Sequence, residues 1–267
     1  MHRGLIGLLL LAIAAGPARA AAPDQIGVAR RLYNEQQYDR ALQVVREMER
    51  AHGETAPLRL LVGRIELEMY RQSARPEDLE AARVALRAID GHLLDARERL
   101  ELTIGLAELL YFDDRFGATA ELLEPVLDAT ALLGSSAHER ALDWWATALD
   151  RQAQTNSGAA DAAYARILTK MEAELQKDPS STPAGYWLAA AARASGDLDR
   201  AWAAAAAAWV RAPQAQDRGA RLRADLDRLV RQAIIPQRAA RLQVRDHGQA
   251  LAGMLNEWEA FKAQWAR

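Results

Sequence analysis

The chain has 267 residues, no cysteine, 50% hydrophobic residues and a formal net charge of −2 at pH 7. The lack of cysteine excludes a disulfide framework and a lipid attached through an N-terminal cysteine. The slightly acidic balance argues against general nucleic-acid binding, and the few Gly and Pro residues between periodic stretches favour helices joined by short loops.

The first twenty residues have the pattern of an export signal. Arg3 precedes an apolar run over residues 5–15, and Ala18-Arg19-Ala20 offers a small-residue cleavage site. The run is shorter than the about 20 residues that a membrane-spanning helix needs. We therefore expect residues 1–20 to be a signal peptide, the protein to be periplasmic or secreted, and no integral membrane segment to remain after cleavage. An uncleaved anchor is the alternative.

Residues 24–213 carry apolar side chains at helical spacing and predict about five pairs of helices. Residues 73–76 are expected to form a long loop inside the second pair, and Pro125 to bend the second helix of the third pair. The predicted pairs are 26–36 with the stretch from 38 to a break at Gly53, 58–69 with 79–89, 102–112 with 116–127, 137–151 with 161–177, and the two helices of 183–213 around a turn at Ser195-Gly196-Asp197.

Small residues recur twelve positions apart in three of these pairs, where two helices must approach closely. In the last pair a proline, Pro213, closes the unit. The three small-residue pairs are Ala29 with Ala41, Ala107 with Thr119, and Ala189 with Ala201.

This pattern resembles the tetratricopeptide repeat family, whose unit is a helix-turn-helix of about 34 residues. The resemblance departs from the family pattern at Gly53, where proline is usual, and at Ala192 and Ala205, where aromatic residues are usual. The second and fourth pairs follow it only in their periodicity. The resemblance implies an all-α fold, namely a right-handed superhelical solenoid of helix pairs, with a concave surface lined by the first helix of each pair.

After Pro213 the rhythm changes, and residues 214–267 are expected to form capping helices. One apolar stripe runs from Leu222 to a stop at Pro236, and a second covers the last helix. A solenoid needs such an end piece with a polar outer face.

The segment 211–245 is rich in arginine. A salt-bridged cap is the plainer interpretation of it, and the alternative is a basic patch for an acidic partner, anionic lipid headgroups or an acidic wall polymer. Pairs one helical turn apart are Arg221 with Asp225, Arg223 with Asp227, and Asp227 with Arg231.

The sequence predicts no catalytic centre, metal site or cofactor. The five histidines show no His-x-x-x-His spacing, and neither a phosphate-binding loop nor a nucleophile elbow is present. Carboxylate pairs such as Glu121 with Glu124, or Asp113 with Asp114, are interpreted as solvated surface rather than as an acid and a base.

By the resemblance, the concave surface should bind a protein or peptide partner. The function predicted is an exported, non-enzymatic helical scaffold of the cell envelope. The alternatives are a solute-binding or transporter-accessory protein and, ranked last, a cell-wall hydrolase. The alanine-rich helices also allow a homo-oligomer. The groove residues expected from the resemblance are Arg30, Tyr33, Asn34, Glu108, Tyr111, Phe112, Tyr186 and Arg193.

Overall fold

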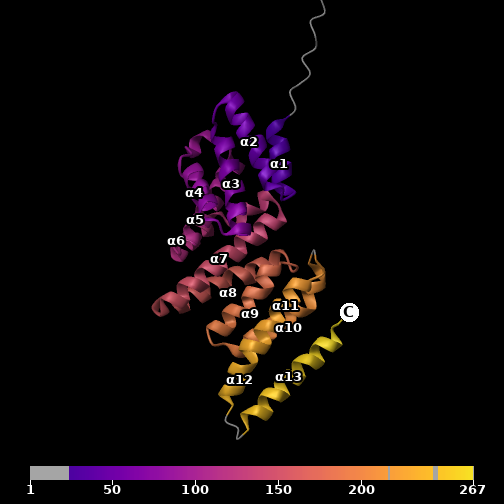
Figure 1. Ribbon diagram of the computed structural model, residues 1–267. Coiled ribbons are helices and arrows are strands. Elements are labelled where there is room, and N and C mark those ends of the chain that lie inside the picture. Colours follow the sequence, from indigo (N-terminus) through magenta and orange to yellow (C-terminus); the bar gives the residue numbers. More distant parts are fainter. Residues whose placement is uncertain (1–23, 216, 243–245, 267) are drawn as a thin grey trace, which may run out of the picture.

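The computed structural model describes residues 24–215, 217–242 and 246–266, and this part of the chain is all-helical, without strands (Figure 1). The expected signal peptide, residues 1–20, lies outside the described residues. The α-helices are α1 (Gln25–Asn34), α2 (Tyr38–His52), α3 (Ala56–Ser73), α4 (Pro76–Arg87), α5 (Ala96–Phe112), α6 (Phe116–Leu123), α7 (Ser135–Thr155), α8 (Ala160–Lys177), α9 (Thr182–Ala194), α10 (Leu198–Arg211), α11 (Ala220–Leu229), α12 (Ile235–Arg241) and α13 (His247–Gln264).

The helices are stacked in chain order along an elongated molecule. Helices α1 to α6 form one end, α7 and α8 cross the middle, and α9 to α13 form the other end (Figure 1). Each helix from α1 to α10 packs on the next one, and α3 with α5, α7 with α9 and α9 with α11 also touch. The prediction of an all-α chain built from neighbouring helix pairs is therefore confirmed.

Several helices begin where an acidic or hydroxyl side chain satisfies a free backbone N–H. Asp95 caps α5 by accepting from Glu98 N at 2.7 Å, and the Glu98 side chain accepts from Asp95 N in return. Such a capping box fixes the first turn of the helix. Side chains of Asp24, Ser181, Asp197 and Asp246 cap α1, α9, α10 and α13.

The small residues twelve positions apart lie at close helix contacts, as the sequence indicates. All six members of the three pairs are fully buried. In the third pair the Thr119 hydroxyl donates across to the Ala107 carbonyl at 3.4 Å, which shows that the backbones of α5 and α6 approach closely. A larger side chain at either position would separate the two helices.

The prediction of a long loop at residues 73–76 is wrong. Helix α3 continues through Ser73 and α4 begins at Pro76, so only Ala74 and Arg75 separate them. Ala74 has a left-handed backbone (φ 54°) that turns the chain at once, and its N–H bonds to Tyr70 O. Pro76 starts the next helix because the first turn requires no backbone N–H from it.

Two prolines act differently from the expectation. At Pro125 the chain does not continue as a bent α-helix: α6 ends at Leu123, and a 3₁₀ turn spans Glu124–Val126. At Pro236 the helix does not stop. A π-helical turn over Val230–Ile234 leads directly into α12. Because a π-turn moves the preceding carbonyls, it relieves the clash that the prolyl ring makes in a regular α-helix.

The C-terminal helix is held by aromatic packing. Trp258 is fully buried against Trp202, Trp209 and Phe261, with ring centroids 5.4–5.6 Å apart. Its indole N–H donates to Asp227 at 2.9 Å, so the ring's polar atom is satisfied inside the cluster.

Two arginines of α12 bond to the preceding helix pair, α9 and α10. Arg238 pairs with Asp199 at 3.1 Å, and Arg241 donates to the Gly196 carbonyl at 2.8 Å. Of the three predicted surface pairs, only Asp227 with Arg231 comes within ion-pair range, at 3.9 Å.

The other two predicted pairs are wrong because their members have other partners. Arg223 lies over the Trp209 ring, 5.2 Å from its centroid, and donates to the Trp265 carbonyl. Asp225 pairs with Arg228, three residues after it, at 3.2 Å rather than with Arg221, four residues before it.

Candidate functional site

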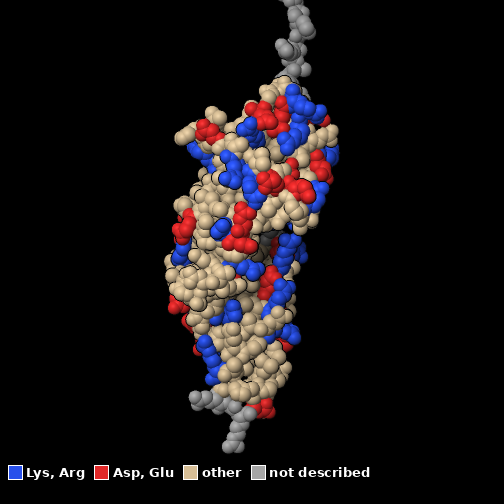
Figure 2. Space-filling view, turned by 60° about the vertical axis from the view of Figure 1, so that its left-hand side comes forward, with Lys and Arg blue, Asp and Glu red and all other residues tan. Residues whose placement is uncertain are grey.

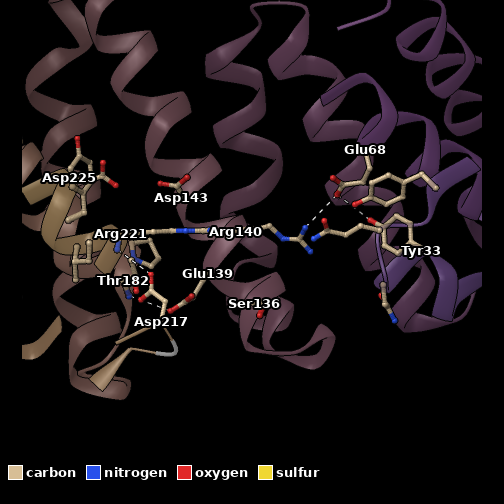
Figure 3. A pocket seen from close by; sticks show the side chains of 16 residues that line it. Tyr33, Glu68, Ser136, Glu139, Arg140, Asp143, Thr182, Asp217, Arg221 and Asp225 are labelled. Atoms are coloured by element: carbon tan, nitrogen blue, oxygen red, sulfur yellow. Dashed lines mark hydrogen bonds and ion pairs between the residues drawn. The ribbon is translucent and has the colours of Figure 1, made fainter. Parts of the chain in front are cut away.

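A groove of about 1010 Å³ runs between the two ends of the molecule. Its walls come mainly from the odd-numbered helices α1, α3, α7, α9 and α11, so residues far apart in the sequence face one another across it (Figure 3). Five of its lining residues are acidic and two are arginines, which gives the groove a net negative lining. The lining residues are Tyr33, Asn34, Gln36, Tyr38, Glu68, Ser136, Glu139, Arg140, Asp143, Thr182, Pro183, Tyr186, Asp217, Arg221, Leu222 and Asp225.

Helix α7 forms the floor of the groove. Ser136, Glu139, Arg140 and Asp143 stand at helical spacing and present one polar face. None of the binding residues expected from the sequence lies on this helix. The sequence does contain a pattern that could have indicated this polar face. Four polar residues at positions i, i+3, i+4 and i+7 lie on one side of a helix whose other side is apolar.

One end of the groove holds three carboxylates that are bonded only to neutral donors. Glu139 accepts from Thr182 N at 3.3 Å, and Asp143 accepts from Trp187 Nε1 at 2.8 Å. Asp217 accepts from Gly219 N at 2.8 Å. Among the residues that the structure describes, none of the three has an ion-pair partner.

Burial raises the pKa of both Glu139 and Asp143, and the neighbouring carboxylates raise it further. A cation placed at this end of the groove would lower both pKa values again and would be attracted by the negative potential. The three carboxylates and Arg221 gather on the left of Figure 3.

The other end of the groove is a charged network. Arg140 points from α7 towards Glu68 of α3, with 3.5 Å between Nη1 and Oε1 (Figure 3). Glu68 also accepts from the Tyr33 hydroxyl at 3.3 Å and from Arg71 at 3.2 Å. Burial raises the pKa of Tyr33, so its hydroxyl remains a neutral donor to this carboxylate at neutral pH.

The structure brings three of the expected groove residues to the groove itself, namely Tyr33, Asn34 and Tyr186. Arg30 lines a smaller pocket that opens beside Tyr33 and Asn34. Arg193 lies where its charge acts on the Tyr186 hydroxyl, but its Nε is buried.

The three expected residues on α5 lie elsewhere. Tyr111 and Phe112 pack against Trp144, with ring centroids 4.7 and 5.6 Å away. Glu108 is buried beneath them, only 7% exposed, and its Oε2 has no hydrogen-bond partner. A 3₁₀ turn over Asp128–Leu133 packs against both α5 and α7.

The described residues contain no group of three or more His, Asp or Glu side chains placed to hold a metal ion. Among the helices described, none combines the length and the apolar character required to cross a membrane. On the face shown in Figure 2, basic and acidic side chains are interleaved, so the groove is a more specific candidate for a binding site than a broad charged field.

Comparisons with known proteins add no relative: no family model matches the chain, and neither the curated proteins nor the solved structures give a match.

Proposed function

We propose that the protein is an exported, non-enzymatic helical scaffold of the tetratricopeptide type, which binds a polypeptide segment in its groove. The observation that carries the proposal is the groove itself, which is lined by one layer of helices from both ends of the molecule. A ligand lying along it would contact α1, α3, α7, α9 and α11 together. An extended chain segment has the shape for this, because it presents side chains along its whole length.

The lining indicates the chemistry of that segment. Tyr33, Tyr38 and Tyr186 supply rings, which give large contact areas for little loss of conformational entropy. The unpaired carboxylates Glu139 and Asp143 favour Lys or Arg side chains opposite them. We therefore propose a partner segment that carries basic residues.

The solute-binding alternative is less well supported by this lining. Pockets for small molecules are mostly apolar with a few polar groups, whereas charged and polar residues make up most of the lining here. The hydrolase alternative ranks last because Glu139 and Asp143 are each held by a structural donor, Thr182 N and Trp187 Nε1.

Fluorescence anisotropy with labelled 12-residue peptides tests the proposal. One randomised pool carries lysine at alternate positions and a matched pool carries glutamate. We expect saturable binding of the lysine pool alone. Glu139→Gln with Asp143→Asn should weaken it about tenfold, because the two unpaired charges that face the ligand are lost.

The matched control removes two exposed acids outside the groove, Asp161→Asn with Glu257→Gln, and should leave binding unchanged. Equal weakening in both double variants would show a non-specific charge effect. If neither pool binds while a screen of small solutes raises the melting temperature, the solute-binding alternative replaces the scaffold.

A further inference from the structure

A second, smaller pocket of about 130 Å³ lies between α1, α3, α5 and α7, beside the groove. Each of these four helices contributes one arginine to its wall: Arg30, Arg64, Arg97 and Arg140. Glu101 is the one carboxylate in the lining. The remaining lining residues are Tyr33, Asn34, Leu60, Leu61, Leu133 and Ala137.

Three of the arginines have acidic partners, but each contact uses little of the guanidinium. Arg30 reaches Glu98 at 3.0 Å and Arg97 reaches Glu101 at 3.3 Å. Arg140 reaches Glu68 at 3.5 Å, at the limit of a hydrogen bond. Since a guanidinium carries five N–H donors, each of the three keeps donors for a further acceptor.

Arg64 has no acidic partner within ion-pair range in the described part of the chain. Its side chain donates to the Tyr33 hydroxyl and to the Glu101 carbonyl, both at 3.3 Å. Glu108 shares a neighbouring cavity of about 30 Å³ with Arg64 but does not come within ion-pair range of it. Burial lowers the pKa of Arg64, but Tyr33, Glu108 and Glu101 raise it more, so its guanidinium stays charged beside the pocket. Because four arginines and one carboxylate line the pocket, an anion placed in it would be attracted.

The arrangement also restricts the shape of the anion. A planar carboxylate presents two oxygens in one plane and suits one or two guanidinium forks. Four arginines from four helices line this pocket, and so many donors together suit a tetrahedral group with several acceptor oxygens. The volume is well above the roughly 10–15 Å³ that a single water needs, so the pocket has room for such a group.

We propose that this pocket binds one tetrahedral oxyanion of the phosphate class, either free or as a monoester on a larger ligand. The pocket shares Tyr33, Asn34 and Arg140 with the groove. A bound oxyanion would therefore lie beside any ligand in the groove and would compete with Glu68 for the Arg140 guanidinium. The site stands independently of the peptide-binding proposal.

Isothermal titration calorimetry with inorganic phosphate tests the site, with acetate as the planar comparison and glycerol 3-phosphate as the monoester. We expect one saturable phosphate site and at least about tenfold weaker binding of acetate. Binding of glycerol 3-phosphate as tight as that of phosphate identifies a monoester site, and binding of phosphate alone identifies a free-anion site. Absence of saturable phosphate binding, or acetate binding equally well, overturns the proposal.

The double variant Arg30→Gln with Arg97→Gln should weaken phosphate binding about tenfold, since two of the four guanidinium groups are lost. Both side chains are part-exposed, at 38% and 55%, so the fold should tolerate the change. The matched control is Arg46→Gln with Arg59→Gln, two equally exposed arginines in ion pairs outside the pocket.

Equal weakening in both double variants overturns the site. Arg97→Lys, which keeps the charge, provides a second variant and should lose less affinity than Arg97→Gln. Circular dichroism melting curves verify that each variant is folded.

Discussion

At the scale of single residues, Asp128 is a carboxylate whose pKa the fold lowers strongly. It accepts hydrogen bonds from Lys177 at 2.9 Å and Lys170 at 3.1 Å, and these bring its pKa to about 2. The ionised form is therefore favoured in the folded state. Its contribution to stability is fully present above about pH 4 and is lost as the pH falls towards 2.

Asp128→Asn should therefore lower the free energy of unfolding at pH 7, by no more than about 1 kcal/mol because the side chain is 67% exposed and water screens the pair. The difference from the wild type should shrink between pH 4 and pH 3. Urea unfolding at these three pH values measures it. A difference that stays constant with pH would show that the substitution acts through something other than the charge.

At the scale of elements, α3, α4 and α5 interlock around one leucine. Leu86 of α4 is 1% exposed and projects between Gly63 of α3 and Gly105 of α5. A Cβ at Gly63 would lie 2.5 Å from Leu86 Cγ, and one at Gly105 would lie 3.0 Å from Leu86 Cδ1. The two glycines thus form the socket that lets the three helices pack closely.

Gly63→Ala should destabilise the protein by about 1–2 kcal/mol, because the overpacking exceeds the gain in helix propensity. In a Leu86→Ala background the same substitution should be neutral or stabilising, since the clash is gone. A double-mutant cycle by urea unfolding measures this coupling. Simple additivity of the two changes would contradict the socket.

At the scale of the whole molecule, the buried core is a series of clusters that follow the chain. Trp145 is fully buried in the cluster of the middle helices, and Trp258 in the cluster of α9 to α13. Successive clusters share helices, such as α5 and α9, so the stability of one end depends on the other end through intermediate helices.

Trp258→Ala should lower the free energy of unfolding of its own cluster by about 3–5 kcal/mol. Hydrogen-exchange protection should therefore fall far more in α9 to α13 than in α1 to α4. Hydrogen-exchange mass spectrometry measures this by segment. Leu123→Ala, in the middle cluster, provides the comparison, because it should affect α5 to α9 first. A uniform loss of protection along the chain after Trp258→Ala would show a single cooperative core instead.

The sequence was sufficient for features that depend on local periodicity. Helical spacing of apolar residues and the small residues at Ala29, Ala41, Ala189 and Ala201 predicted the pairs, because a short side chain at a helix contact has the same consequence in any context. Pro236 was misjudged, because the turn before it is π-helical and the apolar spacing of the sequence does not reveal such a turn.

The binding surfaces depended on tertiary structure. Tyr33, Asn34 and Tyr186 line the groove, but Glu139 and Asp143 were not identified, because the sequence does not show which face of α7 borders the groove. The arginines of the smaller pocket were not identified from the sequence either. In the sequence each looks like an ordinary surface charge, and only helix packing brings Arg30, Arg64, Arg97 and Arg140 around one pocket. Helix formation and the close helix contacts could be predicted from the sequence, since they are short-range effects of side-chain size and spacing. Which charges meet could be seen only in the folded molecule, because that depends on the angles between helices far apart in the chain.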